Sequence, residues 1–585
     1  MGGNMAAVKK KPHWAFDTED DSRGNTTIIN FYNGKTHHTF TARDVRKEHP
    51  RWGVKRVTKE VRKRAIEFLL NLESGTLKIW ALNLQYDLVN VFADHLEVLE
   101  ISYVGSRVIS ARVPGTQVSF FDTLNHWKIS AKEMGKRIGL QKIEVDGDFE
   151  NVDYCRRDTE IVWHFVEKMT EVYEGIDCKL KATIGSTSLR YFQDEFYGKI
   201  TEQVFKTKEL EYMKEGYFGG RTEIFHLFPV KGKIWYFDFN SLYPSVMREN
   251  FPILTKDGFH FTKTPNFENE GFVDATFIAP KSISIPYLPF RDPRSGRLLF
   301  PLGTFRTRVT FFEARRAVFL GYSIDRIHSA LEFTAGSFQP FRDFVEFVYA
   351  KRLEAKQHGD SLMSDAFKLL ANNLYGKFGQ GRDFTKLTPH YGMVKPGDIV
   401  LGPLVVRESR GPFPTHTNFI WSGYTTAYGR DKLWRAGDEV IQKNGLLMYM
   451  DTDSVIFEND KPIFENSDAL GELKLEKPYD SQFPHFGYAH FKLPKLYRME
   501  TVEGVSLYRA RGVRRDNARE FFETGRASFK RPYKLRETLR RNLNPKRKLK
   551  LIPNFWDDIE KQSQKVYDKR VVNSDGSTTP LIIGG

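Results

Sequence analysis

Three aspartates follow apolar stretches that are typical of buried strands. Asp238 ends the run WYFD, and Asp451 and Asp453 stand two apart in MYMDTDS. A carboxylate at the end of a buried strand is costly unless it is hydrogen-bonded, paired or bound to a cation. Mg²⁺ takes its ligands from a few carboxylates, waters and substrate phosphates, so three acids from two strands could hold the paired ions of a phosphoryl transfer. Taken alone, DTDS also fits turn aspartates that cap backbone amides.

Two predicted helices could add cations to these acids. Residues 343–378 are predicted to form a helical hairpin with a break at 357–361. One face of the second helix, at i, i+4 and i+7, carries Lys368, Asn372 and Tyr375. The first helix offers Arg352 and Lys356 at i, i+4. The hairpin could therefore present three cations to a triphosphate, with plain solvated charges as the alternative.

A second group of acids lies in the N-terminal third. Asp17 and Glu19 stand two apart in AFDTED, so on a strand both carboxylates point to one face. Asp87 ends NLQYD, and Asp158 follows Tyr154 by one helical turn in YCRRD. Four carboxylates and a tyrosine can bind two metal ions and orient a water for attack on a phosphodiester. Exposed acids on surface helices are the alternative.

Composition favours a polyanionic partner. Lys plus Arg number 89 against 74 Asp plus Glu, a net charge of +15, which suits nucleic acid or an anionic membrane, with a merely soluble basic surface as the alternative. A chain of 585 residues is expected to form several domains. No apolar run approaches the roughly 18 residues that span a bilayer, so no membrane partner is expected. Two cysteines cannot form a disulfide framework, which predicts a reducing cytoplasm.

The elements expected to position these residues alternate between strands and helices. Residues 15–165 mix short apolar strands with helical stretches and predict a compact α/β unit. KIWYFDFNSLYPSVM predicts a buried strand that runs into a turn and a helix start, and LLMYMDTDSVIF predicts two strands around a tight turn. Residues 178–199 are expected to be a polar segment, and 379–415 an extended insertion. The basic run 530–550 is expected to follow a duplex backbone, and the last dozen residues to be frayed.

The segments DFNSLYPS, KLLANNLYG and DTDS, in this order, resemble the three polymerase motifs of family B DNA polymerases. The resemblance implies that Asp238 and Asp451 are the metal-binding catalytic pair, with Asp453 as a supporting acid. Tyr243 matches the ring that excludes a ribose 2′-hydroxyl. The residues that the resemblance assigns to binding the incoming nucleotide are Tyr243, Arg352, Lys356, Lys368, Asn372 and Tyr375.

Two further motifs resemble DNA-contacting elements of the same family. Lys495 and Tyr497 in PKLYRM are similar to the KxY element, which contacts the primer strand. Tyr217, Gly219 and Gly220 in GYFGGR are similar to the YxGG element between the nuclease and polymerase lobes. There, glycines let the backbone approach template phosphates.

The first 170 or so residues resemble DnaQ-like proofreading exonucleases through the motifs DxE, NxxYD and YxxxD. The resemblance implies that Asn83 and Tyr86 contact the frayed primer end, together with Thr123 and Leu124 in DTLNHW. The last two match a TLxxh element that is typical of the protein-primed branch. All the catalytic acids are present, which favours an active nuclease. The first motif begins near the start of the chain, which suggests a minimal phage or mobile-element form.

The resemblance implies an α/β multidomain fold, in which an RNase H-like (DnaQ-like) exonuclease domain precedes a right-hand polymerase with palm, fingers and thumb. The expected division is exonuclease 1–176, first part of the palm 177–250, palm insertion 251–335 similar to terminal-protein region 1, fingers 336–378, insertion 379–415 similar to terminal-protein region 2, second part of the palm 416–500, and thumb with C-terminal tail 501–585.

The expected function is template-directed DNA synthesis with 3′→5′ proofreading, most similar to protein-primed, strand-displacing phage enzymes. Expected cofactors are two Mg²⁺ ions per active site, with Mn²⁺ as a substitute. Expected partners are primer and template DNA, dNTPs and a terminal-protein primer, bound by a monomer in the host cytoplasm. One rival is a primer-independent family B polymerase of a mobile element. Another is a non-catalytic DNA-binding protein, or a nuclease with a decayed polymerase site, although no metal carboxylate is missing.

Overall fold

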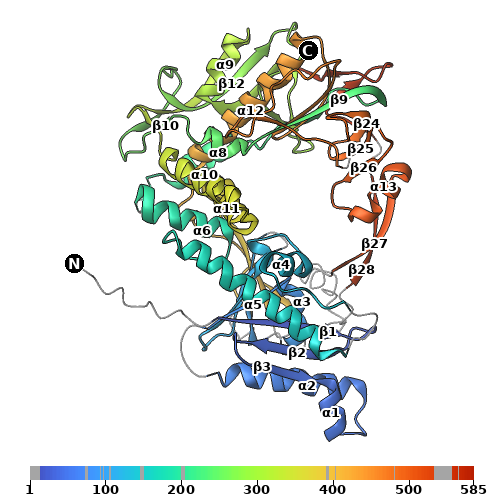
Figure 1. Cartoon of the computed structure of the whole chain (residues 1–585). Helices are drawn as coiled ribbons and strands as arrows, with labels where there is room; N and C mark the ends of the chain where they lie inside the picture. Colours follow the sequence, from blue (N-terminus) through green and yellow to red (C-terminus); the bar gives the residue numbers. More distant parts are fainter. Residues whose placement is uncertain are drawn as a thin grey trace, which may run out of the picture.

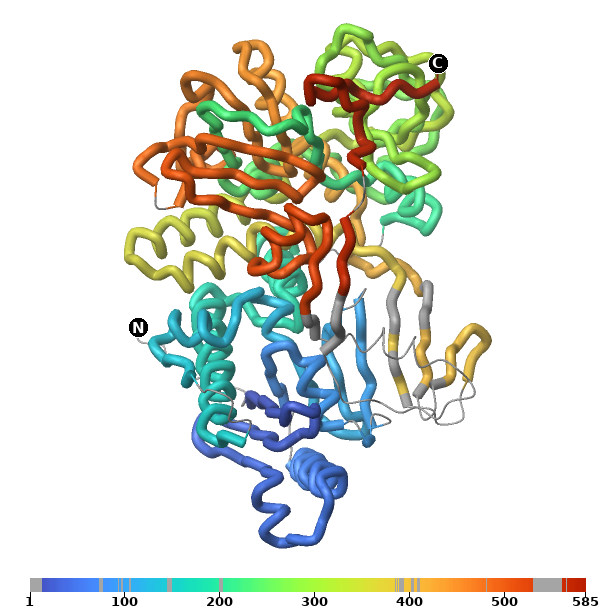
Figure 2. The backbone as a smooth tube through the Cα atoms, turned by 90° about the vertical axis from the view of Figure 1, so that its right-hand side faces the viewer, coloured from blue at the N-terminus to red at the C-terminus, as the bar shows by residue number. Residues whose placement is uncertain are grey.

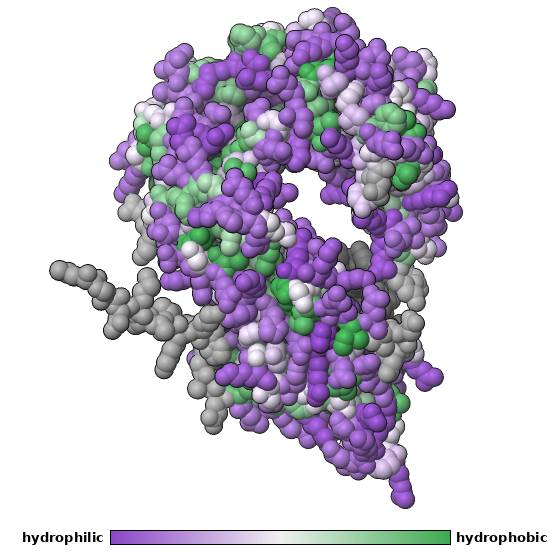
Figure 3. All heavy atoms as spheres, in the orientation of Figure 1, coloured by the Kyte–Doolittle hydropathy of each residue, from purple (hydrophilic) through white to green (hydrophobic). Residues whose placement is uncertain are grey.

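The computed structural model is an open ring of lobes (Figure 1). It describes residues 13–72, 77–92, 94–95, 98–104, 107–144, 150–198, 204–389, 394–401, 404–479, 481–532, 556–563 and 566–584. In the space-filling view the central opening is rimmed mainly by hydrophilic residues (Figure 3). None of the described helices combines the length and apolarity needed to cross a membrane.

The N-terminal lobe is built on one mixed sheet, in the order β19-β20-β18-β5-β6-β7-β4-β1-β2-β3. Strand β1 pairs in parallel with β4 and antiparallel with β2, and β4 pairs in parallel with β7. Helices cover the sheet and bury Phe16, Phe31 and Phe120. The strands are β1 (His13–Asp20), β2 (Thr26–Tyr32), β3 (His37–Thr41), β4 (Leu77–Ala81), β5 (Glu100–Val104), β6 (Arg107–Arg112) and β7 (Val118–Asp122). The helices are α1 (Ala42–Glu48), α2 (Val54–Leu70), α3 (Leu84–Phe92), α4 (Ala131–Ile138) and α5 (Val152–Glu174), with a 3-10 turn at Thr123–Asn125.

The insertion 379–415 contributes three strands to this N-terminal sheet, which the sequence did not predict. They are β18 (Asp383–Pro389), β19 (Ile399–Leu401) and β20 (Leu404–Arg410). Strand β18 pairs antiparallel with β5, with Leu387 opposite Ile101. Figure 2 shows the yellow strands of the insertion beside the light-blue strands of the N-terminal lobe. An edge strand such as β5 offers unpaired backbone groups to any extended segment, so this contact depends on tertiary structure and not on the local pattern.

The upper lobe contains an antiparallel sheet in the order β26-β25-β24-β9-β22-β21-β8, with β23 paired to β9. The long helix α12 (Phe419–Gln442) packs on this sheet and buries Leu433, Trp434 and Val440. The strands are β8 (Thr222–Ile224), β9 (Val230–Phe239), β21 (Leu446–Asp451), β22 (Ser454–Glu458), β23 (Leu473–Leu475), β24 (Phe486–Leu493), β25 (Leu496–Thr501) and β26 (Ser506–Ala510). The predicted strand, turn and helix start correspond to β9 and α8 (Leu242–Val246), and the predicted strand pair around DTDS to β21 and β22.

The helical hairpin predicted for 343–378 is confirmed as α10 (Arg342–Gln357) and α11 (Ser361–Phe378). The expectation of a polar segment at 178–199 was wrong, because α6 (Ile184–Phe192) lies there and is followed by a π-helical turn at Gln193–Tyr197. Helix α6 buries Leu189, Tyr191 and Phe192, and its Ser188 hydroxyl donates to Leu370 O of α11 at 2.6 Å. Helix α7 (Thr207–Glu215) follows α6 in the chain and contacts α12.

A smaller five-stranded sheet, in the order β11-β16-β12-β15-β31, stands beside the upper lobe. Its members are β11 (Phe259–Thr262), β12 (Glu270–Ala279), β15 (Leu302–Thr310), β16 (Ser323–Phe333) and β31 (Ile582–Ile583), with helix α9 (Phe311–Phe319). Four separate two-stranded sheets complete the described strands: β10 (Phe251–Pro252) with β17 (Ser337–Phe338), β13 (Phe290–Arg291) with β14 (Leu298–Leu299), β27 (Arg526–Pro532) with β28 (Trp556–Gln562), and β29 (Arg570–Val572) with β30 (Thr578–Pro580). Helix α13 (Ala518–Thr524), preceded by a 3-10 turn at Arg515–Asn517, lies next to β27.

The C-terminal segment is not the frayed tail that the sequence suggested. Strand β31 pairs in parallel with β15, and Leu302 N donates to Leu581 O at 2.8 Å. The Thr578 hydroxyl donates to Ile224 O at 2.9 Å, which ties β30 to β8. Backbone pairing and buried contacts therefore fix the segment, and neither leaves a strong local sequence signal. Of the basic run 530–550, residues 533–550 lie outside the described residues.

A buried ion cluster holds this C-terminal segment to the upper lobe. Arg221 Nε donates to Glu223 Oε2 at 2.7 Å, and Arg570 Nη1 lies 3.7 Å from Glu223 Oε1. All three side chains are at most 2% exposed. Two guanidinium groups thus share one carboxylate away from water.

Replacing Glu223 by Gln should destabilise the upper lobe strongly, because it leaves two buried guanidinium groups without a counter-charge. We expect the free energy of unfolding to fall by about 3–5 kcal/mol. The exposed pair Lys63–Glu67 provides the control, and Glu67→Gln should cost less than about 0.5 kcal/mol. Chemical denaturation followed by tryptophan fluorescence measures both. Equal stability of the two variants would contradict the importance of the buried cluster.

Candidate active sites

A cavity of about 400 Å³ lies where the β9 end of the upper sheet meets α10 and α11. It brings together the predicted acids, cations and aromatic residues of the polymerase-like motifs. The described residues that line it are Asp238, Phe239, Asn240, Ser241, Leu242, Tyr243, Arg352, Lys356, Lys368, Asn372, Tyr375, Asp453, Lys474 and Glu476. Sequence analysis missed Lys474 and Glu476. Their only local signal is the alternation of apolar and charged residues in LKLEK, at and just after β23.

The fold forces acids from separate strands together at this cavity. Asp238 is near the end of β9, opposite Ser454 of β22, and Asp453 lies in the turn before that strand. Burial, followed by the charges of Asp453 and Glu476, raises the pKa of Asp238 to about 7. Burial and the charge of Asp451 also raise the pKa of Asp453. These acids repel each other in the absence of a cation, and a cation would relieve that repulsion.

Asp451 is placed differently from its neighbour Asp453. Lys495 Nζ donates to both carboxylate oxygens of Asp451 at 2.8 Å. The hydroxyls of Tyr449 and Thr222 add hydrogen bonds to Asp451 of 2.9 and 3.0 Å. Among the described residues, Asp453 lines the cavity and Asp451 does not. The geometry therefore favours Asp238 and Asp453 as the pair that faces a substrate, whereas the sequence analysis paired Asp238 with Asp451.

Backbone strain gathers at the functional motifs. Four of the six described non-glycine residues with positive φ lie there: Asn83, Ser241, Thr452 and Lys495. Such conformations persist only where the surrounding structure imposes them. At Thr452, φ is 64°, in the turn that separates Asp451 from Asp453. This turn, and not the period of a strand, decides where the two carboxylates point.

The YxGG element packs against the same turn. A Cβ added to Gly220 would lie 2.9 Å from both Thr452 Cγ2 and Tyr243 Oη. A Cβ at Gly219 would meet open space. Gly220 is therefore required by close packing within the protein, whereas the sequence analysis explained both glycines by an approach to DNA. The Tyr217 ring lies against Gly379 at the end of α11.

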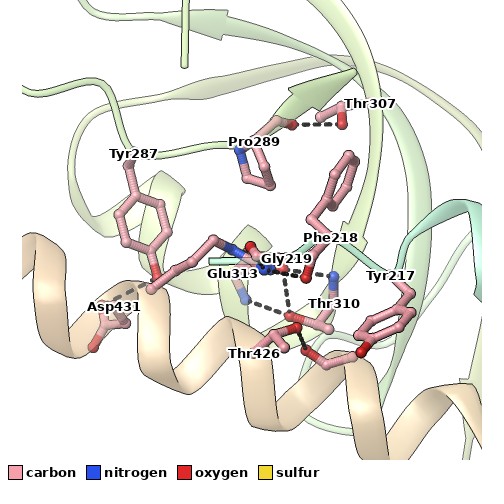
Figure 4. Close-up of polar contacts among 12 residues, drawn as sticks. Tyr217, Phe218, Gly219, Tyr287, Pro289, Thr307, Thr310, Glu313, Thr426 and Asp431 are labelled. Atoms are coloured by element: carbon pink, nitrogen blue, oxygen red, sulfur yellow. Dashed lines mark hydrogen bonds and ion pairs between the residues drawn. The ribbon is translucent and has the colours of Figure 1, made fainter. Parts of the chain in front are cut away.

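Helix α12 holds this element through a buried arginine that sequence analysis missed. Arg430 Nη1 donates to Phe218 O at 2.7 Å and to Gly219 O at 2.9 Å. Its Nη2 pairs with Glu313 Oε1 at 2.6 Å, and Glu313 also closes a capping box with Thr310 at the start of α9. Figure 4 shows Glu313 and Thr310 beside the backbone of Phe218 and Gly219. Helix α12 carries six charged residues, and the sequence alone does not show which of them is buried.

The opposite wall of the cavity is cationic and aromatic. The Tyr243 and Tyr375 rings lie 4.5 Å apart, centroid to centroid. Arg352 Nη1 donates to Ser241 Oγ at 2.8 Å. Burial lowers the pKa of the Arg352 guanidinium, and burial together with the charge of Arg352 lowers the pKa of Lys356. Adjacent cations next to a cavity favour an anionic ligand. Lys368 and Asn372 face the same space.

The KxY residues lie behind the catalytic turn. Lys495, in the turn between β24 and β25, holds Asp451 as described above. Tyr497 is buried, with its ring centroid 5.3 Å from Phe491 and 5.8 Å from Tyr449. These two residues therefore support the position of Asp451 within the lobe.

A second acidic centre forms in the N-terminal lobe. Strand β1 supplies Asp17 and Glu19, α3 supplies Asp87, and α5 supplies Asp158. Burial and the neighbouring carboxylates raise the pKa of Glu19 to about 8 and those of Asp17 and Asp87 well above their usual range. Asp17 Oδ2, Asp87 Oδ2 and Asp158 Oδ1 are buried without a hydrogen-bond partner among the described residues. Buried carboxylate oxygens without donors are the ligand set that a divalent cation satisfies.

A lysine that sequence analysis missed borders this acidic centre. Lys142 Nζ contacts Asp158 Oδ2 and lies 4.4 Å from the centroid of the Tyr154 ring. Burial alone would lower the pKa of Lys142, but Asp158 and Tyr154 outweigh it and raise that pKa. The Asn151 side chain caps α5 by accepting from Tyr154 N at 3.1 Å, so Tyr154 and Asp158 fall in its first two turns.

The residues expected to contact a frayed primer end differ in how far their side chains are already buried or hydrogen-bonded within the protein. The Tyr86 hydroxyl donates to Asp20 Oδ2 at 3.0 Å. Asn83 has φ of 66°, and its backbone N–H donates to Asp122 Oδ1 at 3.1 Å. Thr123 is fully buried and donates to Ala81 O at 3.1 Å, so its side chain supports the end of β4 and does not face solvent. Leu124 is half-buried beside it.

Comparison with known proteins shows that this chain is similar to DNA polymerases. A family model described as DNA polymerase type B, organellar and viral, matches residues 134–390. A probable DNA polymerase of Neurospora intermedia is 25% identical over 444 residues, which cover 70% of this chain and 44% of that protein. The DNA polymerase of Bacillus phage phi29 is 25% identical over 392 residues, which cover 61% of this chain and 62% of that protein. The chain thus matches less than half the length of the fungal relative.

Solved structures show the same relationship at the level of the fold. Phi29 DNA polymerase complexed with primer-template DNA and incoming nucleotide substrates matches with a TM-score of 0.66 and 16% identity, over 90% of this chain and 96% of that chain. The chain is thus related to the type B DNA polymerases of organelles and viruses, and it has their fold of an exonuclease domain joined to a polymerase with palm, fingers and thumb.

Proposed function

We propose that this chain is a template-directed DNA polymerase with 3′→5′ proofreading exonuclease activity. The observation that carries the proposal is the single cavity that joins Asp238 and Asp453 on one wall to Arg352, Lys356 and Lys368 on the other. Acids opposite a cluster of cations suit a metal-bound triphosphate. The sequence relatives named DNA polymerases, and the phi29 complex with primer-template DNA and nucleotides, support DNA and dNTPs as partners.

Both acidic centres fit divalent cations, and we propose Mg²⁺ at each, with Mn²⁺ as a substitute. In the polymerase centre, Asp238 and Asp453 would hold the ions and Asp451 would support the turn. Bound there, the ions would supply Lewis acidity that activates a primer 3′-hydroxyl and stabilises the departing pyrophosphate. The chain itself holds these carboxylates close together, although burial and mutual repulsion raise their pKa and so disfavour the ionised form.

The fingers hairpin would bind the triphosphate. Arg352 is already fixed by Ser241 at the edge of the cavity, while Lys356 and Lys368 are exposed and free to move onto phosphate oxygens. The adjacent, mutually tilted rings of Tyr243 and Tyr375 would form the floor under the sugar and base. A ring in this position leaves no room for a ribose 2′-hydroxyl, which selects deoxynucleotides by exclusion.

The N-terminal centre would hydrolyse a 3′ terminal phosphodiester. Asp17, Glu19, Asp87 and Asp158 would hold the metal ions, and Tyr154 with Lys142 would orient the attacking water. Tyr86 precedes Asp87 on α3, Asn83 follows the end of β4, and Leu124 follows the end of β7; we propose that the three steady the unpaired end. The two centres share no residue, so each activity can be removed separately.

We assign residues 1–176 to the nuclease, 177–250 and 416–500 to the palm, 336–378 to the fingers and 501–585 to the thumb and tail. The insertions 251–335 and 379–415 correspond to the regions that protein-primed relatives carry. The pairing of β18 with β5 supports a role for the second insertion in closing the ring around DNA, because it joins the fingers to the nuclease sheet. On the basis of this likeness we propose priming by a terminal protein.

Separate substitutions should divide the two activities. Asp238→Ala or Asp453→Ala should lower primer extension by about three orders of magnitude and leave degradation of single strands intact, because each removes a ligand from one centre only. Asp17→Ala with Glu19→Ala should do the reverse and raise misincorporation. Extension and degradation of one labelled primer, resolved on a gel with Mg²⁺, measure both activities.

Asp460→Ala is the matched control, since Asp460 is an exposed aspartate a few residues beyond the catalytic turn. It should leave both activities at the parental level. Near-normal extension by Asp238→Ala, or simultaneous loss of both activities in the Asp17 and Glu19 double variant, would refute the assignment of two independent centres.

Sugar selection should depend on the ring of Tyr243. Replacement by Val opens the space beside Tyr375, so ribonucleotide incorporation relative to deoxynucleotide incorporation should rise by about tenfold or more. Tyr243→Phe keeps the ring and should keep the preference. Single-nucleotide insertion kinetics with dNTP and rNTP provide the ratio, and an unchanged preference in the Val variant would remove Tyr243 from this role.

A further inference from the structure

The N-terminal acidic centre also contains a thiol. Cys155 follows Tyr154 on α5, is fully buried, and its Sγ lies 3.6 Å from Asp17 O. The Sγ of Cys155 and one carboxylate oxygen each from Asp17 and Glu19 lie within 4.8 Å of one another. Strand β1 and helix α5 thus bring together three possible metal-ligand atoms, two oxygens and one sulfur.

Unpartnered acids beside these donors point independently to a bound cation. Asp87 is 1% exposed, and its Oδ2 has no hydrogen-bond partner among the described residues. Asp158 is 9% exposed, and its Oδ1 is likewise without a partner there. The thiol therefore lies beside a group of carboxylates, several of whose oxygens have no hydrogen-bond donor among the described residues, and not in an apolar core.

The two kinds of donor suit different metals. Mg²⁺ takes oxygen ligands and keeps several waters, so it would use the carboxylates and leave the thiol untouched. Zn²⁺ binds carboxylate oxygen at about 2.0–2.2 Å and thiolate sulfur at about 2.3 Å, and thiolate favours such softer ions. Donor atoms already within 4.8 Å of one another need only small side-chain rotations to reach one ion. Binding would form a metal–sulfur bond and release the thiol proton to solvent.

We propose that Asp17, Glu19 and Cys155 form a mixed carboxylate–thiolate site for a thiophilic divalent cation, which competes with Mg²⁺ and switches off the nuclease alone. The cavity of the polymerase centre has no cysteine among its described lining residues. The only other cysteine in the sequence, Cys178, lies in a hydrophobic cluster with Tyr173 and Met169. A thiophilic ion can therefore distinguish the two centres. The selective effect on degradation rests on the proposed nuclease function, whereas the binding of the ion does not.

Titration of the full chain with Cd²⁺ alone tests the site, because a cadmium–thiolate bond has an ultraviolet charge-transfer band that carboxylates lack. The wild-type chain and Cys178→Ser should both develop the band up to one equivalent of Cd²⁺. Cys155→Ser keeps the size and the carboxylates, and Cys155→Ala provides a second variant in case the first does not fold. Neither should show the band, and half-saturation measured by competition should require at least about tenfold more Cd²⁺. A band that persists without Cys155, or no band in the wild type, overturns the site.

Activity assays separate this inference from the proposed function. With Mg²⁺ present, added Zn²⁺ should stop degradation of a single-stranded primer while extension continues, and a chelator should restore degradation. Cys155→Ser should need at least about tenfold more Zn²⁺ for the same inhibition. A chain that shows the Cd²⁺ band but never degrades DNA would support the metal site and refute the nuclease. A chain that degrades DNA and shows equal Zn²⁺ inhibition with and without Cys155 would refute the site.

Discussion

Repulsion between buried carboxylates is the constraint around which both centres are built. At one centre, β9 and the turn before β22 bring Asp238 within the influence of Asp453 and Glu476. At the other, β1, α3 and α5 gather four acids, and the charges of Asp87, Glu19 and Asp158 add to burial in raising the pKa of Asp17. Burial adds to the cost in each case. A fold that accepts this cost at two separate places must recover it from something that binds there, and a divalent cation is the ligand that these oxygens fit.

The protein's own cations show which acids are left for that ligand. Lys495 neutralises Asp451, Lys142 reaches Asp158, and Arg430 neutralises Glu313 beneath the YxGG element. Asp238 and Asp453 receive no such partner among the described ion pairs. The backbone follows the same division, because the strained residues Ser241 and Thr452 flank these two acids. Ion pairs thus fix Asp451 and Glu313 in place, whereas Asp238 and Asp453 stay open to a ligand. In the N-terminal centre, Lys142 contacts only one oxygen of Asp158, and the other oxygen has no hydrogen-bond partner among the described residues.

Sequence alone predicted the helices and strands that are marked by apolar periodicity and turn residues within their own segments. The period of the apolar residues and the break near Gly359 predicted the helices α10 and α11, and the apolar runs around DTDS predicted β21 and β22. Contacts between distant segments were not predictable. The pairing of β18 with β5, and of β31 with β15, depends on edges that exist only in the folded sheets. Which of Asp451 and Asp453 lines the cavity depends on the turn at Thr452, where φ is positive. The burial of Thr123 depends on its packing against β4. Residue types alone encode neither feature.

Thermal stability with and without divalent cations reports the repulsion among the buried carboxylates, independently of any activity. Asp87→Asn is the suitable variant, since it keeps the shape of the side chain and the acceptor for the Thr18 hydroxyl, which donates to Asp87 Oδ1 at 2.8 Å. Because the substitution relieves the repulsion among the acids, we expect a higher Tm for Asp87→Asn than for the wild type in a chelator. We also expect Mn²⁺ to raise the Tm of the wild type more than that of the variant. A lower Tm of Asp87→Asn in the chelator, together with equal shifts on adding Mn²⁺, would contradict the account.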